Sequence, residues 1–295
     1  MKSLATSSIR LENIAQDLSL LIKARLSLMV VFTTLVGFLL TNKNGIEYVL
    51  LAATLIGTTL SACGAAALNQ WWERDLDARM SRTQHRPLPA GRLHPGDAFL
   101  LGLLFSLVGI AILFLFVNEL SALLAGLTIL SYLLIYTPLK RRSSLNTLVG
   151  AIPGALPPLI GYVASQGQLG LGGWVLFFIL WFWQMPHFLA IAWMYRDQYA
   201  EAGFVMLSKN DDSGKITSRQ ALIYSAFLLP TTLLPTALGI NNIIYAIAAF
   251  ALGIVFLMQA LAFAKQPSTH HARSLFFASI IYLPLLLGLL MITRR

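Results

Sequence analysis

Apolar residues in this chain fall in long blocks separated by short polar segments. Each block is roughly twenty residues long, the length that an α-helix needs to cross a hydrocarbon core of about 30 Å. The pattern predicts an all-α integral membrane protein, with one transmembrane domain over residues 1–295. Nine transmembrane helices are expected, at residues 26–41, 50–72, 98–117, 119–137, 146–164, 172–194, 220–240, 243–264 and 273–292. Composition agrees, because 57% of the residues are hydrophobic and only 11% are charged.

Basic residues predict how these helices are oriented. When nine spans are threaded through a bilayer, eighteen of the 21 Lys and Arg residues fall on one side, and the exceptions are Lys43, Arg294 and Arg295. Lys and Arg stay on the cytoplasmic side, so the N-terminus is expected inside and the C-terminus outside a bacterial-type inner membrane. The net charge of +9 then reflects topology, and the lipid bilayer rather than a nucleic acid is the expected partner.

The helix spacing predicts an internal duplication. The first four expected helices and the next four begin 120 to 124 residues apart, which indicates pseudo-repeats at about 20–140 and 141–265, with the ninth helix at about 273–292 outside them. The repeat makes two long cytoplasmic loops equivalent, at residues 73–97 and 195–219. Eight of the 12 acidic residues lie in these loops, and long polar loops in a helical bundle commonly carry function.

The first loop opens with a regular set of oxygen-bearing side chains. Asn69, Glu73 and Asp77 are spaced at i, i+4 and i+8, so a helix places them within about 80° on one face. Hard divalent cations prefer amide and carboxylate oxygens, and an acidic face at the end of a membrane helix is costly without a counter-charge. The cluster predicts a Mg²⁺ site that holds a diphosphate. The alternative is a solvated helix end paired with nearby arginines.

The second loop carries a shorter acidic pair at the equivalent place. Asp197 and Glu201 are again four residues apart, so two facing acidic helix ends could hold Mg²⁺ between them. An exposed turn that binds no metal is the alternative.

Basic residues lie on both sides of the first acidic cluster. Arg82 and Arg86 follow it, and Lys140 and Arg141 close the fourth expected helix. Diphosphate oxygens need Arg or Lys as well as Mg²⁺, so Arg82 and Arg86 are expected to bind the substrate, and Lys140 and Arg141 to act in catalysis. Positive-inside anchoring is the alternative for each residue.

The sixth expected helix is rich in aromatic residues and contains a histidine. Its central run reads Trp181-Phe-Trp-Gln-Met-Pro-His187-Phe, which could line the path of an isoprenoid tail or a planar acceptor and stabilise an allylic cation. An ionisable group inside a span indicates function by default, so His187 is expected to contact the acceptor. Interfacial anchoring by the Trp residues and a structural, hydrogen-bonded His187 are the alternatives.

These motifs resemble the UbiA-type intramembrane prenyltransferase superfamily, and within it the branch that farnesylates protohaem IX. Asn69, Glu73 and Asp77 match the superfamily's spacing of Asn and acids, and five longer runs match the branch. These runs are Glu73-Arg-Asp-Leu-Asp-Ala-Arg-Met-Ser-Arg-Thr, Tyr136-Thr-Pro-Leu-Lys-Arg141, Gly150-Ala-Ile-Pro-Gly-Ala-Leu-Pro-Pro-Leu-Ile-Gly161, Trp181-Phe-Trp-Gln-Met-Pro-His187-Phe and Tyr199-Ala-Glu-Ala-Gly203. One departure is Gln198, where the family usually carries an acid.

The resemblance implies Mg²⁺-dependent transfer of farnesyl from farnesyl diphosphate to a vinyl group of protohaem IX (haem B), which gives haem O and diphosphate. It places Mg²⁺ on both acidic clusters, with Asp197 or Glu201 standing in for the acid that is missing at Gln198, and Lys140 and Arg141 near the diphosphate. The active site would face the cytoplasm. Candidate protein partners are haem A synthase and the assembly of a terminal oxidase.

Three other functions stay open on the residues alone. The enzyme could prenylate a different acceptor, such as a quinone-precursor ring. A transporter of a small anion could contain the same helical repeats, although transporter sites usually lie near the bilayer midplane. A haem-binding or assembly protein without catalysis would need axial ligands, and His187 is the only histidine expected inside a span.

Overall fold

Helices form almost all of the regular structure in the computed structural model, which describes residues 14–40 and 45–295. No β-sheet is present within those two ranges. A short helix at Ile14–Leu21 is followed by α2 (Ala24–Leu39), α3 (Tyr48–Asp77), α4 (Pro95–Phe116), α5 (Glu119–Leu130), η1 (Ser131–Tyr136), α6 (Thr137–Leu139), α7 (Asn146–Gln166), α8 (Leu171–Met194), α9 (Arg196–Glu201), η2 (Leu207–Asn210), α10 (Lys215–Ala237), α11 (Ile243–Lys265) and α12 (Thr269–Ile292). The expected all-α fold is confirmed.

Each expected span coincides with helical structure in the described chain, although not every helix is apolar enough to cross a bilayer. Seven helices have the length and composition to do so, and the bent pair of Ile14–Leu21 and α2 raises the number to eight within the described residues. The seventh expected span falls on α10, which contains Pro230, Pro235 and many hydroxyl-bearing residues and is outside that set. The chain is therefore a multi-pass membrane protein, while nine spans and the duplication stay predictions.

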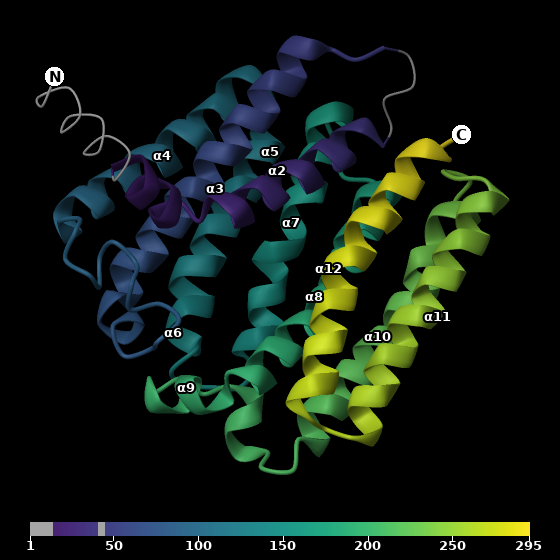
Figure 1. Cartoon of the computed structure of the whole chain (residues 1–295). Coiled ribbons are helices and arrows are strands. Elements are labelled where there is room, and N and C mark those ends of the chain that lie inside the picture. Colours follow the sequence, from purple (N-terminus) through teal and green to yellow (C-terminus); the bar gives the residue numbers. More distant parts are fainter. Residues whose placement is uncertain (1–13, 41–44) are drawn as a thin grey trace, which may run out of the picture.

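The orientation in the membrane also stays a prediction. Lys2, Arg10 and Lys43, which contributed to the expected orientation, lie outside the described residues. Figure 1 shows that the loop after α3 and the segment after α8 lie at the same end of the bundle, near α6 and α9, whereas the C-terminus lies at the other end. The two long loops also meet, because the Arg82 guanidinium of the first donates to the Tyr199 hydroxyl of the second.

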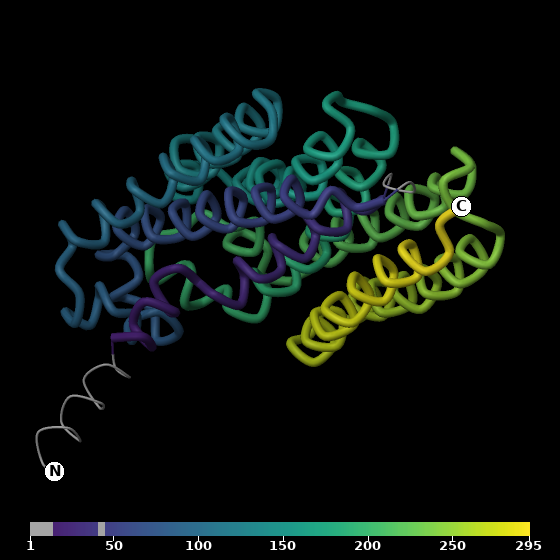
Figure 2. The backbone as a smooth tube through the Cα atoms, turned by 90° about the horizontal axis from the view of Figure 1, so that it is seen from above, coloured from purple at the N-terminus to yellow at the C-terminus, as the bar shows by residue number. Residues whose placement is uncertain are grey.

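Two central helices, α7 and α8, organise the bundle. α7 packs against α2 and α5 as well as α8, and α8 packs against α10 and α12. Figure 2 shows α3 to α5 on one side of this central pair and α10 to α12 on the other. Leu100, Leu104 and Leu107 on the outer helix α4 are exposed, as expected of side chains that face lipid.

Small residues allow α3 and α4 to pack at close range. A Cβ atom placed on Gly109 would lie 2.6 Å from the carbonyl oxygen of Gly57 and 2.6 Å from the backbone nitrogen of Ser61. Lipid tails are as apolar as leucine, so membrane helices associate through this kind of backbone-to-backbone packing. The residues in the seam are Gly57, Ser61 and Gly64 of α3 and Gly102, Ser106 and Gly109 of α4. The seam fixes the helix that carries Asn69, Glu73 and Asp77.

A π-helical turn, η1, interrupts the helix that leads to Lys140. Such turns are rare, and they occur frequently at functional sites. Tyr132 and Tyr136 stack in η1 with 5.5 Å between their ring centroids, and the Lys140 Nζ lies 4.6 Å from the centroid of the Tyr136 ring. The turn thus supplies an aromatic platform for the ammonium of Lys140.

Another loop acid has a structural role at the start of α10. The Asp211 carboxylate accepts a hydrogen bond from the backbone N–H of Thr217 at 2.7 Å, which satisfies a donor of the first helical turn. Burial would raise the pKa of Asp211, but the hydrogen bonds from Thr217, Ile216 and Ser213 outweigh it and lower the pKa. Asp211 is therefore not available to a site elsewhere.

The tight seam between α3 and α4 predicts an unequal response to two small substitutions. In Gly109→Ala the new methyl group would meet the α3 backbone, so the helices must separate, at a cost of about 1–3 kcal/mol. Gly288→Ala on α12 is the matched control, because nothing lies within 4 Å of a Cβ atom there. Thermal unfolding in detergent should show a lower Tm for Gly109→Ala and an equal or higher Tm for Gly288→Ala. Equal Tm values would contradict the close packing of the seam.

Candidate active site

The last two and a half turns of α3 carry three buried oxygen-bearing side chains on one face. Asn69 is fully buried, and Glu73 and Asp77 are 4% and 3% exposed. Asp75, which the helical period places on the other side, is exposed and pairs with Arg74 at 3.6 Å. The structure therefore separates Asp75 from the three clustered side chains, as their spacing predicts.

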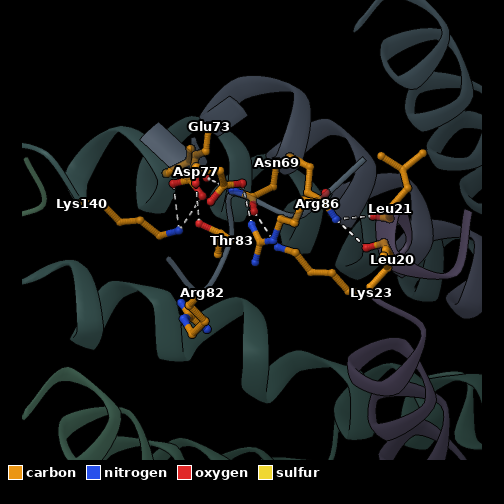
Figure 3. Close-up of polar contacts among 12 residues, drawn as sticks. Leu20, Leu21, Lys23, Asn69, Glu73, Asp77, Arg82, Thr83, Arg86 and Lys140 are labelled. Atoms are coloured by element: carbon orange, nitrogen blue, oxygen red, sulfur yellow. Dashed lines mark hydrogen bonds and ion pairs between the residues drawn. The ribbon is translucent and has the colours of Figure 1, made fainter. Parts of the chain in front are cut away.

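Each of the three side chains is in contact with a different cation. The Lys23 Nζ donates to the Asn69 Oδ1 at 2.7 Å. The Lys140 Nζ donates to both carboxylate oxygens of Glu73, at 2.8 and 2.9 Å, and the Arg86 Nη1 donates to the Asp77 Oδ2 at 2.6 Å. Figure 3 shows the cations reaching the α3 face from separate parts of the chain. We call these six residues the α3 charge cluster.

Local structure holds Arg86 and Lys140 in place. The Thr83 hydroxyl donates to the Asp77 carbonyl at 2.8 Å, which folds the loop after α3 back toward Asp77. The carbonyl of Lys140 accepts the backbone N–H of Val205 at 2.7 Å, so a segment after α8 fixes the backbone beside the ammonium. Burial lowers the pKa of Lys140, but the Glu73 carboxylate and the Tyr136 and Tyr132 side chains raise it by more. Lys140 is thus held in its charged form.

The donor set of the α3 charge cluster suits a hard divalent cation. One amide oxygen and two carboxylates are ligands that Mg²⁺ accepts, and Mg²⁺ commonly takes its remaining ligands from water and substrate phosphate. Within the described residues, no group of three or more His, Cys, Asp or Glu side chains is arranged to hold a metal. The protein therefore offers two carboxylates and one amide, a set that fits a metal bound together with a phosphate ligand.

The second acidic pair is not buried. Asp197 and Glu201 lie on α9, which has no buried residue, and Asp197 pairs with Arg196 at 3.6 Å. No recorded contact within the described ranges joins either acid to the α3 charge cluster. Between them, however, the Gln198 Oε1 is buried and has no hydrogen-bond partner among the described residues. A buried acceptor without a donor is costly, and the Gln198 Oε1 is the one such atom on α9 among the described residues.

Two predicted arginines have different surroundings. The Arg82 guanidinium donates to the Tyr199 hydroxyl at 3.1 Å and lies over the rings of Tyr195 and Tyr199, so it joins the loop after α3 to α9. Arg141 is exposed. It lies with Arg79 on the wall of a cavity of about 630 Å³ that reaches Glu73. The cavity is lined by Trp72, Glu73, Asp75, Leu76, Arg79, Thr137, Pro138, Arg141 and Arg142.

His187 lies at the contact between α8 and α12. Its Nδ1 is 2.7 Å from the Ser279 hydroxyl oxygen, and its ring stacks between Trp183 and Phe276, with centroid distances of 5.2 and 5.0 Å. The Trp183 Nε1 donates to the Ser279 carbonyl at 2.8 Å. Packing and hydrogen bonding thus account for one ring nitrogen of His187, and only Nε2 could face a ligand.

Much of the aromatic run on α8 packs against α10. Trp181 lies edge-on to Tyr224, with 5.9 Å between ring centroids, and Phe182 stacks on Phe227 at 5.7 Å. These contacts bury aromatic surface between two helices. They make interhelical packing the main role of this part of the run.

Sequence reasoning missed Lys23 as a site residue and treated Gln198 only as the place of a missing acid. Lys23 had been counted only as a charge that sets orientation, yet it stands inside an apolar run from Leu18 to Phe32. A charge in such a run indicates function, but Arg25 shares the run, so the sequence alone does not tell which of the two residues faces the site. For Gln198 the sequence signal is its position, where the family usually carries an acid, but nothing in the sequence indicates that its Oε1 is buried without a partner among the described residues.

Comparison with known proteins identifies the family. Residues 30–281 match the UbiA prenyltransferase family. A protoheme IX farnesyltransferase from Opitutus terrae is 48% identical over 276 residues, which cover 93% of each chain. A protein of the same name from Solibacter usitatus is 44% identical over 283 residues and is covered over 97% of its length.

Solved structures share the fold at low sequence identity. A structure of a digeranylgeranylglyceryl phosphate synthase has a TM-score of 0.80 at 16% identity, with coverage of 95% of this chain and 98% of that one. A UbiA homologue from Archaeoglobus fulgidus, bound to GPP and Mg²⁺, has a TM-score of 0.69 at 12% identity, with coverage of 93% and 99%. On these sequence matches, the chain belongs to the UbiA prenyltransferase family and is a membrane-embedded prenyltransferase.

Proposed function

We propose that the protein transfers a farnesyl group from farnesyl diphosphate to a vinyl group of protohaem IX, with Mg²⁺ as the metal, to give haem O and diphosphate. The names of the relatives from Opitutus terrae and Solibacter usitatus support this acceptor and this donor. The observation that carries the chemistry is the α3 charge cluster, which combines oxygen ligands for a metal with cations for a diphosphate.

In this proposal the side chains of α3 hold the metal and the cations bind the leaving group. Mg²⁺, when bound, would neutralise negative charge on the diphosphate. Asn69, Glu73 and Asp77 would supply its protein oxygens, while Lys140 and Arg86 would donate hydrogen bonds to diphosphate oxygens. Arg141, in the lining of the cavity that reaches Glu73, and Arg82, which joins the loop after α3 to α9, would contribute further positive charge.

The reaction balances without an oxidant. The bond between farnesyl C1 and the diphosphate oxygen breaks, and both electrons leave with the oxygen. The vinyl group donates an electron pair to C1, so a carbon–carbon bond forms and a cation develops on the vinyl carbon next to the ring. Water adds there and loses a proton, which gives the hydroxyethylfarnesyl group. The burial of Asn69, Glu73 and Asp77 would limit the access of water to the leaving group before the vinyl group attacks.

The acceptor side of the proposal involves the surface around His187. The Nε2 of that residue is the nitrogen left to orient a tetrapyrrole or to touch its iron, because Nδ1 faces Ser279. Assembly with haem A synthase or a terminal oxidase, which would use the product, belongs to the same proposal. So does a cytoplasmic position of the active site.

Product formation tests the proposed acceptor and metal together. Purified protein in lipid vesicles, given haem B, farnesyl diphosphate and Mg²⁺, should form haem O, which mass spectrometry identifies. Removal of divalent metal with a chelator should stop the reaction, and added Mg²⁺ should restore it. A parallel reaction with 4-hydroxybenzoate as acceptor should give no prenylated ring. Prenylation of that ring but not of haem would replace haem as the acceptor.

Conservative substitutions test the metal ligands. Glu73→Gln and Asp77→Asn keep the side-chain shape but remove a carboxylate charge, so each should lower kcat by at least about a hundredfold. Glu47→Gln is the matched control at the opposite end of the same helix, because Glu47 is exposed and lies outside the lining of the cavity that reaches Glu73, and its kcat should stay near that of the unchanged protein. Circular dichroism and Tm should show that all three variants fold. Near-normal rates in both Glu73→Gln and Asp77→Asn would remove the metal assignment.

Single substitutions on α9 test the second cluster. We keep Asp197 and Glu201 as proposed second ligands, and we add Gln198 because its Oε1 is buried without a partner. Asp197→Ala, Gln198→Ala and Glu201→Ala should be compared by the Mg²⁺ concentration that gives half the maximal rate. Loss of a ligand should raise this concentration about tenfold or more, whereas loss of a solvated side chain should leave it within about twofold. No change in any variant would exclude a metal contact from α9.

A further inference from the structure

Lys23 lies at a break in the first membrane helix. The helix Ile14–Leu21 and α2 meet at 54°, and Lys23 between them has φ 49° and ψ 54°. It is the one residue other than glycine with positive φ in the described part of the chain, and a lysine rarely adopts this left-handed conformation. Strained backbone of this kind persists only where the surrounding structure imposes it.

Contacts on both sides of the break impose that conformation. The Gln70 Nε2 on α3 donates to the carbonyls of Leu20 and Leu21, at 2.6 and 2.9 Å. The Ser27 hydroxyl donates to the Ile22 carbonyl at 2.8 Å. These donors satisfy carbonyls that the break removes from helical hydrogen bonding. The break is therefore built into the fold and positions the Lys23 side chain.

The break directs the ammonium of Lys23 into the α3 charge cluster. Its Nζ lies 2.7 Å from the Asn69 Oδ1 and 3.4 Å from the Tyr132 hydroxyl. Figure 3 shows the Lys23 side chain running toward Asn69 beside Arg86. The ammonium thus occupies the position beside the Asn69 Oδ1 that the proposed function assigns to the metal.

A hydrogen-bond chain fixes which end of the Asn69 amide faces Lys23. The Thr137 hydroxyl donates its single hydrogen to the Tyr132 carbonyl at 2.9 Å. Its oxygen must therefore accept from the Asn69 Nδ2, 3.1 Å away. The amide oxygen is left to point toward Lys23, and it remains the natural ligand for any cation that enters there.

Charge balance links the metal to the diphosphate. The α3 charge cluster holds three cations, Lys23, Arg86 and Lys140, against two carboxylates. A divalent metal that entered alone would add two positive charges, and it would displace the Lys23 ammonium from Asn69 with no new partner. A diphosphate brings several negative charges and oxygen acceptors, so the displaced ammonium gains a ligand in the same step.

We propose that Lys23 is a diphosphate-binding residue which holds the Asn69 oxygen until the metal arrives, and that it thereby makes the binding of the metal and the diphosphate mutually dependent. The inference rests on the metal assignment of the proposed function, and it does not depend on the acceptor. It gives this lysine a role that changes between the unloaded and loaded site. A purely structural tie between α2 and α3 would act equally in both.

Thermal unfolding of the detergent-solubilised protein tests this coupling without any assay of activity. Tm is followed by tryptophan fluorescence with no ligand, with Mg²⁺, with inorganic diphosphate and with both. Ligands that bind the folded state raise Tm according to their affinity. For the unchanged protein we expect little rise with Mg²⁺ alone and a rise with both that exceeds the sum of the separate rises.

Replacement of Lys23 should change this pattern in opposite directions. Lys23→Met removes the competing cation, so Mg²⁺ alone should bind about tenfold more tightly, while diphosphate should tighten Mg²⁺ binding about tenfold less than before. Lys23→Asn keeps a residue that tolerates the left-handed backbone, and it should behave in the same way if Lys23→Met folds poorly. Lys23→Arg should keep most of the coupling. The control is Arg25→Met, two residues away and exposed, which should match the unchanged protein.

The outcomes separate the two hypotheses. Unchanged coupling in both Lys23→Met and Lys23→Asn, with Tm lowered equally in all four conditions, would show a structural role and overturn the inference. Absence of any joint effect of Mg²⁺ and diphosphate on the unchanged protein would overturn the metal assignment and the inference with it. Failure to form haem O alongside normal coupling would count against the acceptor alone.

Discussion

The pairing of oxygens on one helix face with cations from three other segments is the interaction on which the site depends. Two buried carboxylates at the end of a membrane helix are costly unless their charge is compensated. Lys140 and Arg86 compensate Glu73 and Asp77, and Lys23 takes the neighbouring amide oxygen of Asn69. The same contacts tie α2, the loop after α3 and the end of α6 to one helix, so the chemistry and the local fold share their contacts.

The rest of the bundle serves to hold α3 still. Close packing with α4 places the α3 backbone against another helix with little space between them, and Gln70 anchors α3 to the broken start of α2. On the far side of α7, the aromatic contacts of α8 with α10 and α12 also hold neighbouring helices together. Rigid support of this kind is what a preorganised charge cluster requires, since its oxygens and cations must keep their separations.

Local periodicity made part of the fold and site predictable. Apolar blocks located the helices, and spacing by four residues located Asn69, Glu73 and Asp77 on one face, because both features depend on neighbours along a single helix. The partners of these residues were harder to predict, since Lys23 and Lys140 lie 46 and 67 positions away from the residues they contact. Hydropathy also gave no indication of the π-helical turn at η1 or of the exposure of Asp197.

The separation of the partners along the chain has a consequence for how the protein is made. Translation produces α3 well before it produces Lys140, so for a time the Glu73 carboxylate has no ammonium to meet. An unpaired carboxylate resists transfer out of water, and the end of α3 should therefore remain at the water interface until α5, η1 and α6 have entered the membrane. The order of synthesis thus makes the final depth of α3 a late event in biogenesis, set by a residue that lies two candidate membrane spans further along the chain.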